Sequence, residues 1–222
     1  MQSLTGRAPR ERPKITRLPA DVRCREIVDT AFAFIAEHGF ENLRTRDIAS
    51  CVGINSATLH HHFPTKSDLI SAVADKLAKG FRSEKSAPAK VGVSPPDALR
   101  AQFQDARFYR QSRPEFLAVY REFVTRAPRD PQIAELVSEL NGEWLVDVRA
   151  IIVAGTMEGF FRADLDPDAI SALIVTTIWG SVSSAAPGTA ALDRQADELL
   201  KLLAANPPDR NAKRRRSAAR RA

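Results

Sequence analysis

Residues 44–63, RTRDIASCVGINSATLHHHF, decide the fold. Ile48 and Ala49 are placed to face inward from a first short helix, and Gly53 can then adopt the positive φ that a tight turn needs. Asn55 or Ser56 can cap a second short helix, because either side-chain oxygen can accept from an amide two or three residues further on. A supporting helix, a glycine turn and a short second helix together predict a helix-turn-helix.

The second helix begins with small side chains. The major groove of B-DNA is about 12 Å wide and admits one helix, whose first residues meet the edges of the bases. An Asn can bond two atoms of adenine, Ser and Thr can bond to several bases, and an Ala or Thr methyl can touch the thymine methyl. We therefore expect the start of this helix to lie against bases, through Asn55, Ser56, Ala57 and Thr58.

Helices are also predicted on both sides of this stretch. Upstream, apolar residues at helical spacing predict a helix over residues 21–38, with Gly39 placed for a left-handed C-terminal cap. Downstream, Thr65 and Asp68 have the spacing of a capping box and open a longer helix that reaches about Phe81. The result is a three-helix DNA-binding head at residues 20–83.

The rest of the chain reads as a helical body. After a loop rich in Ala, Pro, Ser and Gly at residues 84–96, apolar residues recur every three to four positions, and prolines mark the joints between segments. The predicted helices cover residues 97–112, 115–125, 131–157, 167–185 and 190–204. No stretch alternates as a strand would, so the fold class is all-α: a helix-turn-helix head and a C-terminal helical bundle at residues 97–205.

One segment of the body carries more apolar surface than a single chain needs. Residues 169–178 are apolar nearly all round, which predicts a helix buried on two sides. A homodimer formed through helices near residues 168–185 and 190–204 would cover the surplus face in an isologous contact. Such a dimer would place two DNA-reading helices one helical turn of DNA, or a multiple, apart, and its operator would be pseudo-palindromic.

The positive charge lies at the two ends of the chain. The formal net charge is +6, residues 206–222 alone sum to +6, and the arm at residues 1–19 adds +4 with three prolines among its residues. Blocks of like charge stay disordered and attract polyanions without sequence preference. We expect a flexible basic arm and a disordered basic tail, and the plainer interpretation of the tail is solvation without a dedicated partner.

Enzyme signatures are missing from the sequence. It has no glycine-rich phosphate loop, nucleophile elbow or metal-ligand spacing, so we expect neither an enzyme nor a cofactor. The three histidines at residues 60–62 point about 100° apart on a helix and cannot share one metal ion, so no metal is expected.

Two cysteines, no signal peptide and no long apolar run indicate a cytoplasmic protein without membrane contact. A structural DNA-coating protein, favoured by the basic ends, remains the alternative.

The chain from Arg25 to about Leu69 resembles the TetR (tetracycline-repressor) family in three pieces, ReIvdtAfafiaehGF, TRDIAscvGI and sATLhhHFptKsdLi. The resemblance implies a transcriptional regulator whose second motif helix reads DNA and whose C-terminal helices bind a small-molecule effector and dimerise. It assigns phosphate contacts to Thr45 and Arg46, backbone clamps to His60 and Lys66, and base reading to Asn55, Ser56, Ala57, Thr58 and His61.

Two positions depart from the family pattern. His60 stands where a Tyr is usual, and its imidazole can still bond to phosphate, more strongly when protonated. Arg44 stands where a Thr commonly caps the first motif helix. Because an Arg cannot cap through an oxygen, we expect Thr45 to take the capping role with a shift of one residue.

Aromatic residues gather in the body and could line an apolar ligand cavity between helices. The alternative is that they are plain core, which is the commoner role of aromatics at helical spacing. The candidate ligand-binding residues are Phe103, Phe108, Tyr109, Phe116, Tyr120, Phe123 and Trp144. The sequence as a whole predicts a repressor that an unidentified small-molecule effector releases from its operator.

Overall fold

A computed structural model describes residues 19–84, 92–183 and 190–205 of the chain. These residues form α-helices joined by short turns, with one 3₁₀ turn and no strand beyond an isolated bridge between Phe161 and Ala204. The helices are α1 (Ala20–His38), α2 (Thr45–Val52), α3 (Ser56–His62), α4 (Lys66–Glu84), α5 (Pro95–Ser112), α6 (Pro114–Arg126), α7 (Pro131–Met157), α8 (Pro167–Ser183) and α9 (Ala190–Leu203). The predicted all-α fold is confirmed.

Prolines begin four of the body helices, α5 to α8. A proline fits the first turn because its missing N–H would have no partner there and its φ is already helical. The predicted body helices agree with the structure to within two residues at each end within the described ranges. The basic arm and tail, predicted at residues 1–19 and 206–222, lie outside the described residues except for Pro19.

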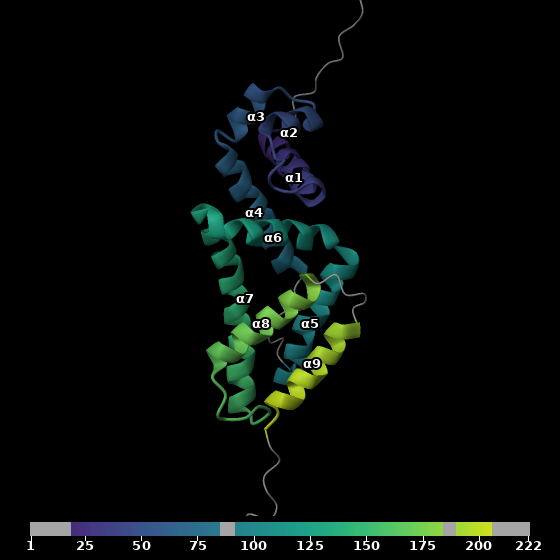
Figure 1. The fold of residues 1–222 in the computed structure, drawn as a ribbon, viewed down its shortest axis with the longest axis vertical. Helices are drawn as coiled ribbons and strands as arrows, with labels where there is room; N and C mark the ends of the chain where they lie inside the picture. Colours follow the sequence, from purple (N-terminus) through teal and green to yellow (C-terminus); the bar gives the residue numbers. More distant parts are fainter. Residues whose placement is uncertain (1–18, 85–91, 184–189, 206–222) are drawn as a thin grey trace, which may run out of the picture.

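The head is a small bundle in which α1 packs against α2, α3 and α4 (Figure 1). The turn after α2 forms at Gly53, which has the left-handed φ of +74° that the sequence predicted. Each helix contributes at least one fully buried aliphatic side chain: Ile27 and Ile35 from α1, Ile48 from α2, Leu59 from α3 and Leu69 from α4. This core fixes the position of α3 at the outer end of the molecule.

The head and the body share one hydrophobic core. The cluster that fills the head continues into α6 and the start of α7. Phe32 of α1 lies 4.9 Å from Phe116 of α6, and Phe40 lies 5.6 Å from Phe123 of α6, measured between ring centroids. A second cluster joins α5, α7, α8 and α9 lower in the body. The head therefore packs directly against α6, so a shift of α6 would also shift the head.

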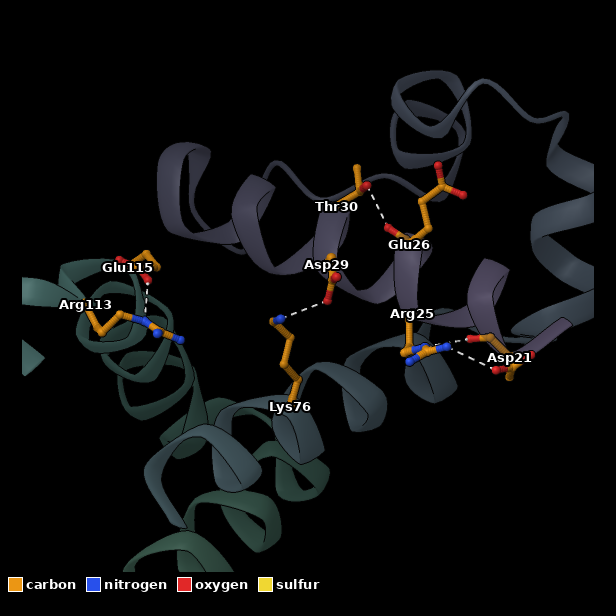
Figure 2. A network of polar contacts seen from close by, with 8 residues as sticks. All are labelled: Asp21, Arg25, Glu26, Asp29, Thr30, Lys76, Arg113 and Glu115. Carbon is orange, nitrogen blue, oxygen red and sulfur yellow. Dashed lines mark hydrogen bonds and ion pairs between the residues drawn. The ribbon is translucent and has the colours of Figure 1, made fainter. Parts of the chain in front are cut away.

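Helix α4 links the two parts, starting in the head and ending in the body (Figure 1). Its Lys76 forms an ion pair of 2.8 Å with Asp29 of α1 and lies over the ring of Phe32, as Figure 2 shows for the ion pair. Surface ion pairs of this kind contribute little stability, typically below about 1 kcal/mol. The contact sets the register of α4 against α1 more than it stabilises the fold.

Helix α8 buries one side in the single chain. Ile174 and Ile178 are fully buried, whereas Leu173 is 60% exposed and its neighbours Thr176 and Thr177 are exposed too. On α9, Leu202 is 70% exposed. The second buried side predicted for α8 is therefore open to solvent in one chain, and the surplus apolar surface lies where the sequence placed the dimer contact.

Candidate nucleic-acid interface and internal cavity

Helix α3 presents an exposed face at the outer end of the head. Leu59 is fully buried and holds the helix to the core. The predicted base-reading residues are open to solvent, apart from Thr58, which is half-buried: Asn55, Ser56, Ala57 and His61. We call these four residues with Thr58 the α3 face. The structure brings all five together on one short helix and its cap.

Asn55 is the N-cap of α3. Its side-chain oxygen accepts from the backbone N–H of Thr58 at 2.7 Å, as the sequence predicted for one of two candidates. This bond stabilises the start of the helix by about 1 kcal/mol. It also occupies one lone pair of the amide oxygen, so the amide NH₂ is the more available group for a base.

The capping role predicted for Thr45 is wrong. Thr45 is the first residue of α2, Arg44 is extended with φ −119° and ψ 131°, and no side chain caps this helix. The first amides of a helix have no partner within the helix. In the described part of the chain, no acceptor is recorded for the N–H of Thr45 or Arg46. The start of α2 therefore offers two free donors, beside the predicted phosphate-binding side chains.

The start of α4 is capped by side chains of its own first turn. Thr65 and Asp68 form the predicted capping box: the Asp68 carboxylate accepts from the Thr65 N–H at 2.9 Å, and the Thr65 hydroxyl accepts from the Asp68 N–H at 3.1 Å. Lys66 follows and is exposed. Partial burial, followed by the repulsion of nearby Arg126, lowers the pKa of the Lys66 amine. A phosphate beside this amine would favour its charged form.

His60 lies in the last turn of α3 and faces the turn that leads to α4. Its Nδ1 is 3.4 Å from the carbonyl oxygen of Pro64. Because a carbonyl can only accept, Nδ1 carries the proton in this contact and a neutral ring would have a lone pair on Nε2. Nε2 can therefore donate to a phosphate only when the imidazole is protonated.

His62 connects α3 to α1. It is half-buried, and its Nδ1 lies 3.3 Å from the Sγ of Cys24 on α1. Nothing in the sequence indicated this pair, because the two residues are 38 positions apart. Among the residues the structure describes, no group of histidines, cysteines and carboxylates could hold a metal ion. In the same ranges, no helix has the length and apolar character that crossing a membrane requires.

An internal cavity lies among α4, α5, α6, α7 and α8. Three of the predicted ligand-binding aromatics line it, Tyr109, Tyr120 and Trp144. The other four lie elsewhere: Phe103 is in the lower core, Phe116 and Phe123 are in the core shared with the head, and Phe108 is 37% exposed.

Two further aromatic rings line the cavity, Phe81 at the end of α4 and Trp179 on α8. Trp179 meets Tyr120 edge to face with 4.1 Å between ring centroids. Trp179 lies directly after the apolar run that the sequence assigned to a buried helix, and nothing in the spacing shows that its ring turns inward. Aliphatic side chains complete the wall: Ala78, Ala106, Leu117, Leu140, Ile178 and Val182.

Polar groups enter this apolar wall in pairs. The indole N–H of Trp144 donates to Gln102 Oε1 at 2.9 Å, and the Tyr120 hydroxyl donates to Asn141 Oδ1. Burial raises the pKa of Tyr120 to about 12, so its hydroxyl stays protonated and remains a donor. At the edge, Arg82 pairs with Glu143 at 2.9 Å. The cavity is thus an apolar space with a few fixed polar groups, the usual character of a small-molecule site.

Comparison with known proteins separates the chain into two matched regions. The family of bacterial regulatory proteins named after tetR matches residues 27–73, and the C-terminal region of BetI-type transcriptional repressors matches residues 95–206.

Among curated proteins, the chain is similar to the HTH-type transcriptional repressor KstR2 of Mycobacterium tuberculosis. The two are 28% identical over 167 residues, covering 73% of this chain and 81% of that protein.

Among solved structures, a protein from Saccharomonospora viridis in complex with choline has a TM-score of 0.74 at 21% identity, covering 84% of this chain and all of that one. AibR in complex with isovaleryl coenzyme A and operator DNA has a TM-score of 0.65 at 16% identity, covering 82% and 97%.

Proposed function

The chain belongs to the tetR family of bacterial regulatory proteins and is a DNA-binding transcriptional regulator, and on this premise we propose how its residues perform that task. The chain acts in the cytoplasm as a repressor rather than an enzyme. It binds a pseudo-palindromic operator as a homodimer and leaves the DNA when a small molecule fills the cavity.

The exposed α3 face carries this proposal. A short helix that is anchored by one fully buried leucine and shows small polar side chains to solvent suits close approach to base edges. The groups proposed to contact phosphate precede and follow this face along the chain: Thr45 and Arg46 at the start of α2, His60 in the last turn of α3 and Lys66 at the start of α4. Phosphate contacts fix the position of the head, and base contacts supply the sequence preference.

The proposed dimer contact uses the open sides of α8 and α9. Leu173 and Leu202 would lose their exposure there, and the small side chains of Ala169, Ala172 and Thr176 would let two copies of α8 approach closely. A twofold axis along this contact leaves both heads free, which is what a two-part operator requires.

The effect of the ligand on DNA binding would be transmitted through Tyr109. Its ring lines the cavity, and its hydroxyl donates to the carbonyl oxygen of Gly80 on α4 at 2.9 Å. A second link ties α6 to the head, because the Glu122 carboxylate accepts from the Phe40 N–H at 2.8 Å, just beyond the end of α1. A ligand that displaces the Tyr109 ring would move α4 and α6, and with them α3. Coupling of this kind amounts to about 1 to 3 kcal/mol.

Selection of DNA fragments by the purified full chain tests the regulator against the DNA-coating alternative. We expect the recovered fragments to share one twofold-symmetric sequence with half-sites one helical turn, or a multiple, apart. Recovery of fragments without a common sequence would favour a coating protein that binds through charge alone.

The ligands named for the structural neighbours, choline and isovaleryl coenzyme A, differ widely in size and charge. The ligand class of this chain therefore depends on its own cavity wall.

A further inference from the structure

Gln102 is the most deeply buried polar side chain of the cavity wall, with 4% of its surface exposed. The Trp144 indole nitrogen can only donate, so the oxygen of the Gln102 amide must face it. The orientation of the amide is thereby fixed, and the NH₂ group points the other way. Among the described residues, no acceptor is recorded for this NH₂. Its nitrogen is not a fully buried atom, so it keeps some accessible surface. Because Gln102 lines the cavity and its oxygen is taken, the NH₂ is the polar group that this side chain has left for a ligand.

Asn141 repeats the arrangement on α7. Its amide oxygen accepts from the Tyr120 hydroxyl, which leaves the NH₂ of Asn141 as the group without a recorded partner in the described chain. In both pairs an aromatic donor occupies the amide oxygen. The cavity therefore offers hydrogen-bond donors toward a ligand from two helices, α5 and α7, within a wall that is otherwise largely aromatic and aliphatic.

The charges at the cavity edge limit the ligand further. Arg82 is the cation of the lining and is paired with Glu143 at 2.9 Å, while Asp105 adds a second carboxylate. An anionic ligand would have to compete with Glu143 for the Arg82 guanidinium. A cationic ligand would be attracted to the carboxylates at the edge, but beside Gln102 and Asn141 it would meet amide NH₂ groups, which carry partial positive charge and repel it.

Resting on the effector role proposed above, we propose that the cavity binds an uncharged, largely apolar molecule whose carbonyl oxygen accepts a hydrogen bond from the Gln102 NH₂. A buried donor without a partner costs free energy, and a ligand carbonyl satisfies it. A hydrocarbon of the same shape would leave the donor unpaired.

Intrinsic fluorescence gives a direct assay, because the chain has two tryptophans and both line the cavity, Trp144 and Trp179. The full chain is titrated with 2-decalone, with decalin and with the 2-decalylammonium ion, each below its solubility limit. We expect the ketone to bind about tenfold more tightly than the hydrocarbon and more tightly than the ammonium ion.

Gln102→Met keeps the volume and removes the donor. It should weaken ketone binding about three- to tenfold and leave decalin binding within about twofold. Gln102→Glu, measured at a pH at which the carboxyl is ionised, keeps an acceptor for Trp144 and removes the donor, so it should reverse the preference between ketone and ammonium ion. Gln195→Met is the matched control, because Gln195 is half-buried, accepts from Ser181 and lies outside the cavity wall. Far-UV circular dichroism confirms that each variant is folded.

Equal affinity of the wild-type chain for ketone and hydrocarbon would overturn the inference, as would tighter binding of the ammonium ion or an undiminished ketone preference in Gln102→Met. No response to any probe would overturn it too, while DNA binding by the same sample would leave the regulator function standing. Ketone binding that depends on Gln102 but never changes operator affinity would uphold the acceptor site and contradict the effector role.

Discussion

Replacement of Gly80 by alanine tests how closely α4 packs against α6, the two helices that are proposed to move when a ligand displaces Tyr109. A Cβ at Gly80 would lie 2.0 Å from Cε1 and 2.7 Å from Cζ of Phe116. The Phe116 side chain is 4% exposed and its ring lies 4.9 Å from Phe32 and 6.0 Å from Phe81 between centroids. The ring therefore has little room to move away, and α4 and α6 must separate.

The expected magnitude follows from two opposing effects. Overpacking a buried site costs about 1 to 3 kcal/mol, and a separation of only 2.0 Å between the new Cβ and Phe116 Cε1 belongs at the upper end. Alanine gains about 1 kcal/mol over glycine within a helix. The net loss is about 2 kcal/mol, which lowers the melting temperature of a chain of this size by about 4 to 8 °C.

Gly142 supplies the matched control, since it lies within α7 and a Cβ there meets nothing within 4 Å. Gly142→Ala should raise the melting temperature by about 2 to 4 °C, because only the helix-propensity gain applies. Thermal unfolding of the full chain is followed by far-UV circular dichroism. Adding Phe116→Leu to Gly80→Ala should recover part of the loss. A Gly80→Ala protein as stable as Gly142→Ala would refute the packing argument.

Four further predictions concern the interface and the cavity. Asn55→Ser should keep the helix cap and alter base preference alone, whereas Asn55→Ala should also lose about 1 kcal/mol of stability, as DNA selection and thermal melts would show. Lys66→Ala should weaken binding to all DNA sequences alike and reduce the salt slope by about 1 in filter-binding assays, and a sequence-dependent loss would argue against a phosphate contact. Tyr109→Phe removes the bond to Gly80 and should reduce the change in operator affinity on ligand binding, measured by fluorescence anisotropy, while the ligand itself still binds. Folding raises the pKa of Tyr120 from 10.0 to about 12. The contribution of Tyr120 to stability is therefore complete below pH 10 and should fall by roughly 1 kcal/mol per pH unit toward pH 12. Denaturant unfolding should show this decline in the unaltered chain and not in Tyr120→Phe.

The local chemistry of the head was predictable because it is written in neighbouring residues. A glycine that must turn, an asparagine that can cap, and a Thr and Asp three residues apart each specify a backbone geometry within one helical turn. Gly53, Asn55 and the Thr65–Asp68 box all took the predicted form. Thr45 did not, because the helix begins one residue after an extended Arg44 and needs no side-chain cap to do so.

The cavity was less predictable because its wall comes from five helices. Spacing along one helix shows which residues share a face, and it does not show which neighbour that face meets. Tyr109 and Phe116 are both buried aromatics next to Gly80 and Phe81, yet Tyr109 borders the cavity and Phe116 fills the core shared with the head. Gln102 carried no signal in the sequence, because its role depends on Trp144, 42 residues away.

The most direct test of whether α3 reads sequence is a ratio of two affinities of the full chain. The affinity for its selected DNA site is divided by the affinity for a shuffled site at the same salt concentration. We predict a ratio of about 10³ or more, which should collapse when Asn55 and Thr58 are both replaced by alanine while the affinity for shuffled DNA stays the same. A ratio near one for the unaltered chain would show that its hold on DNA comes from charge alone and would contradict the account.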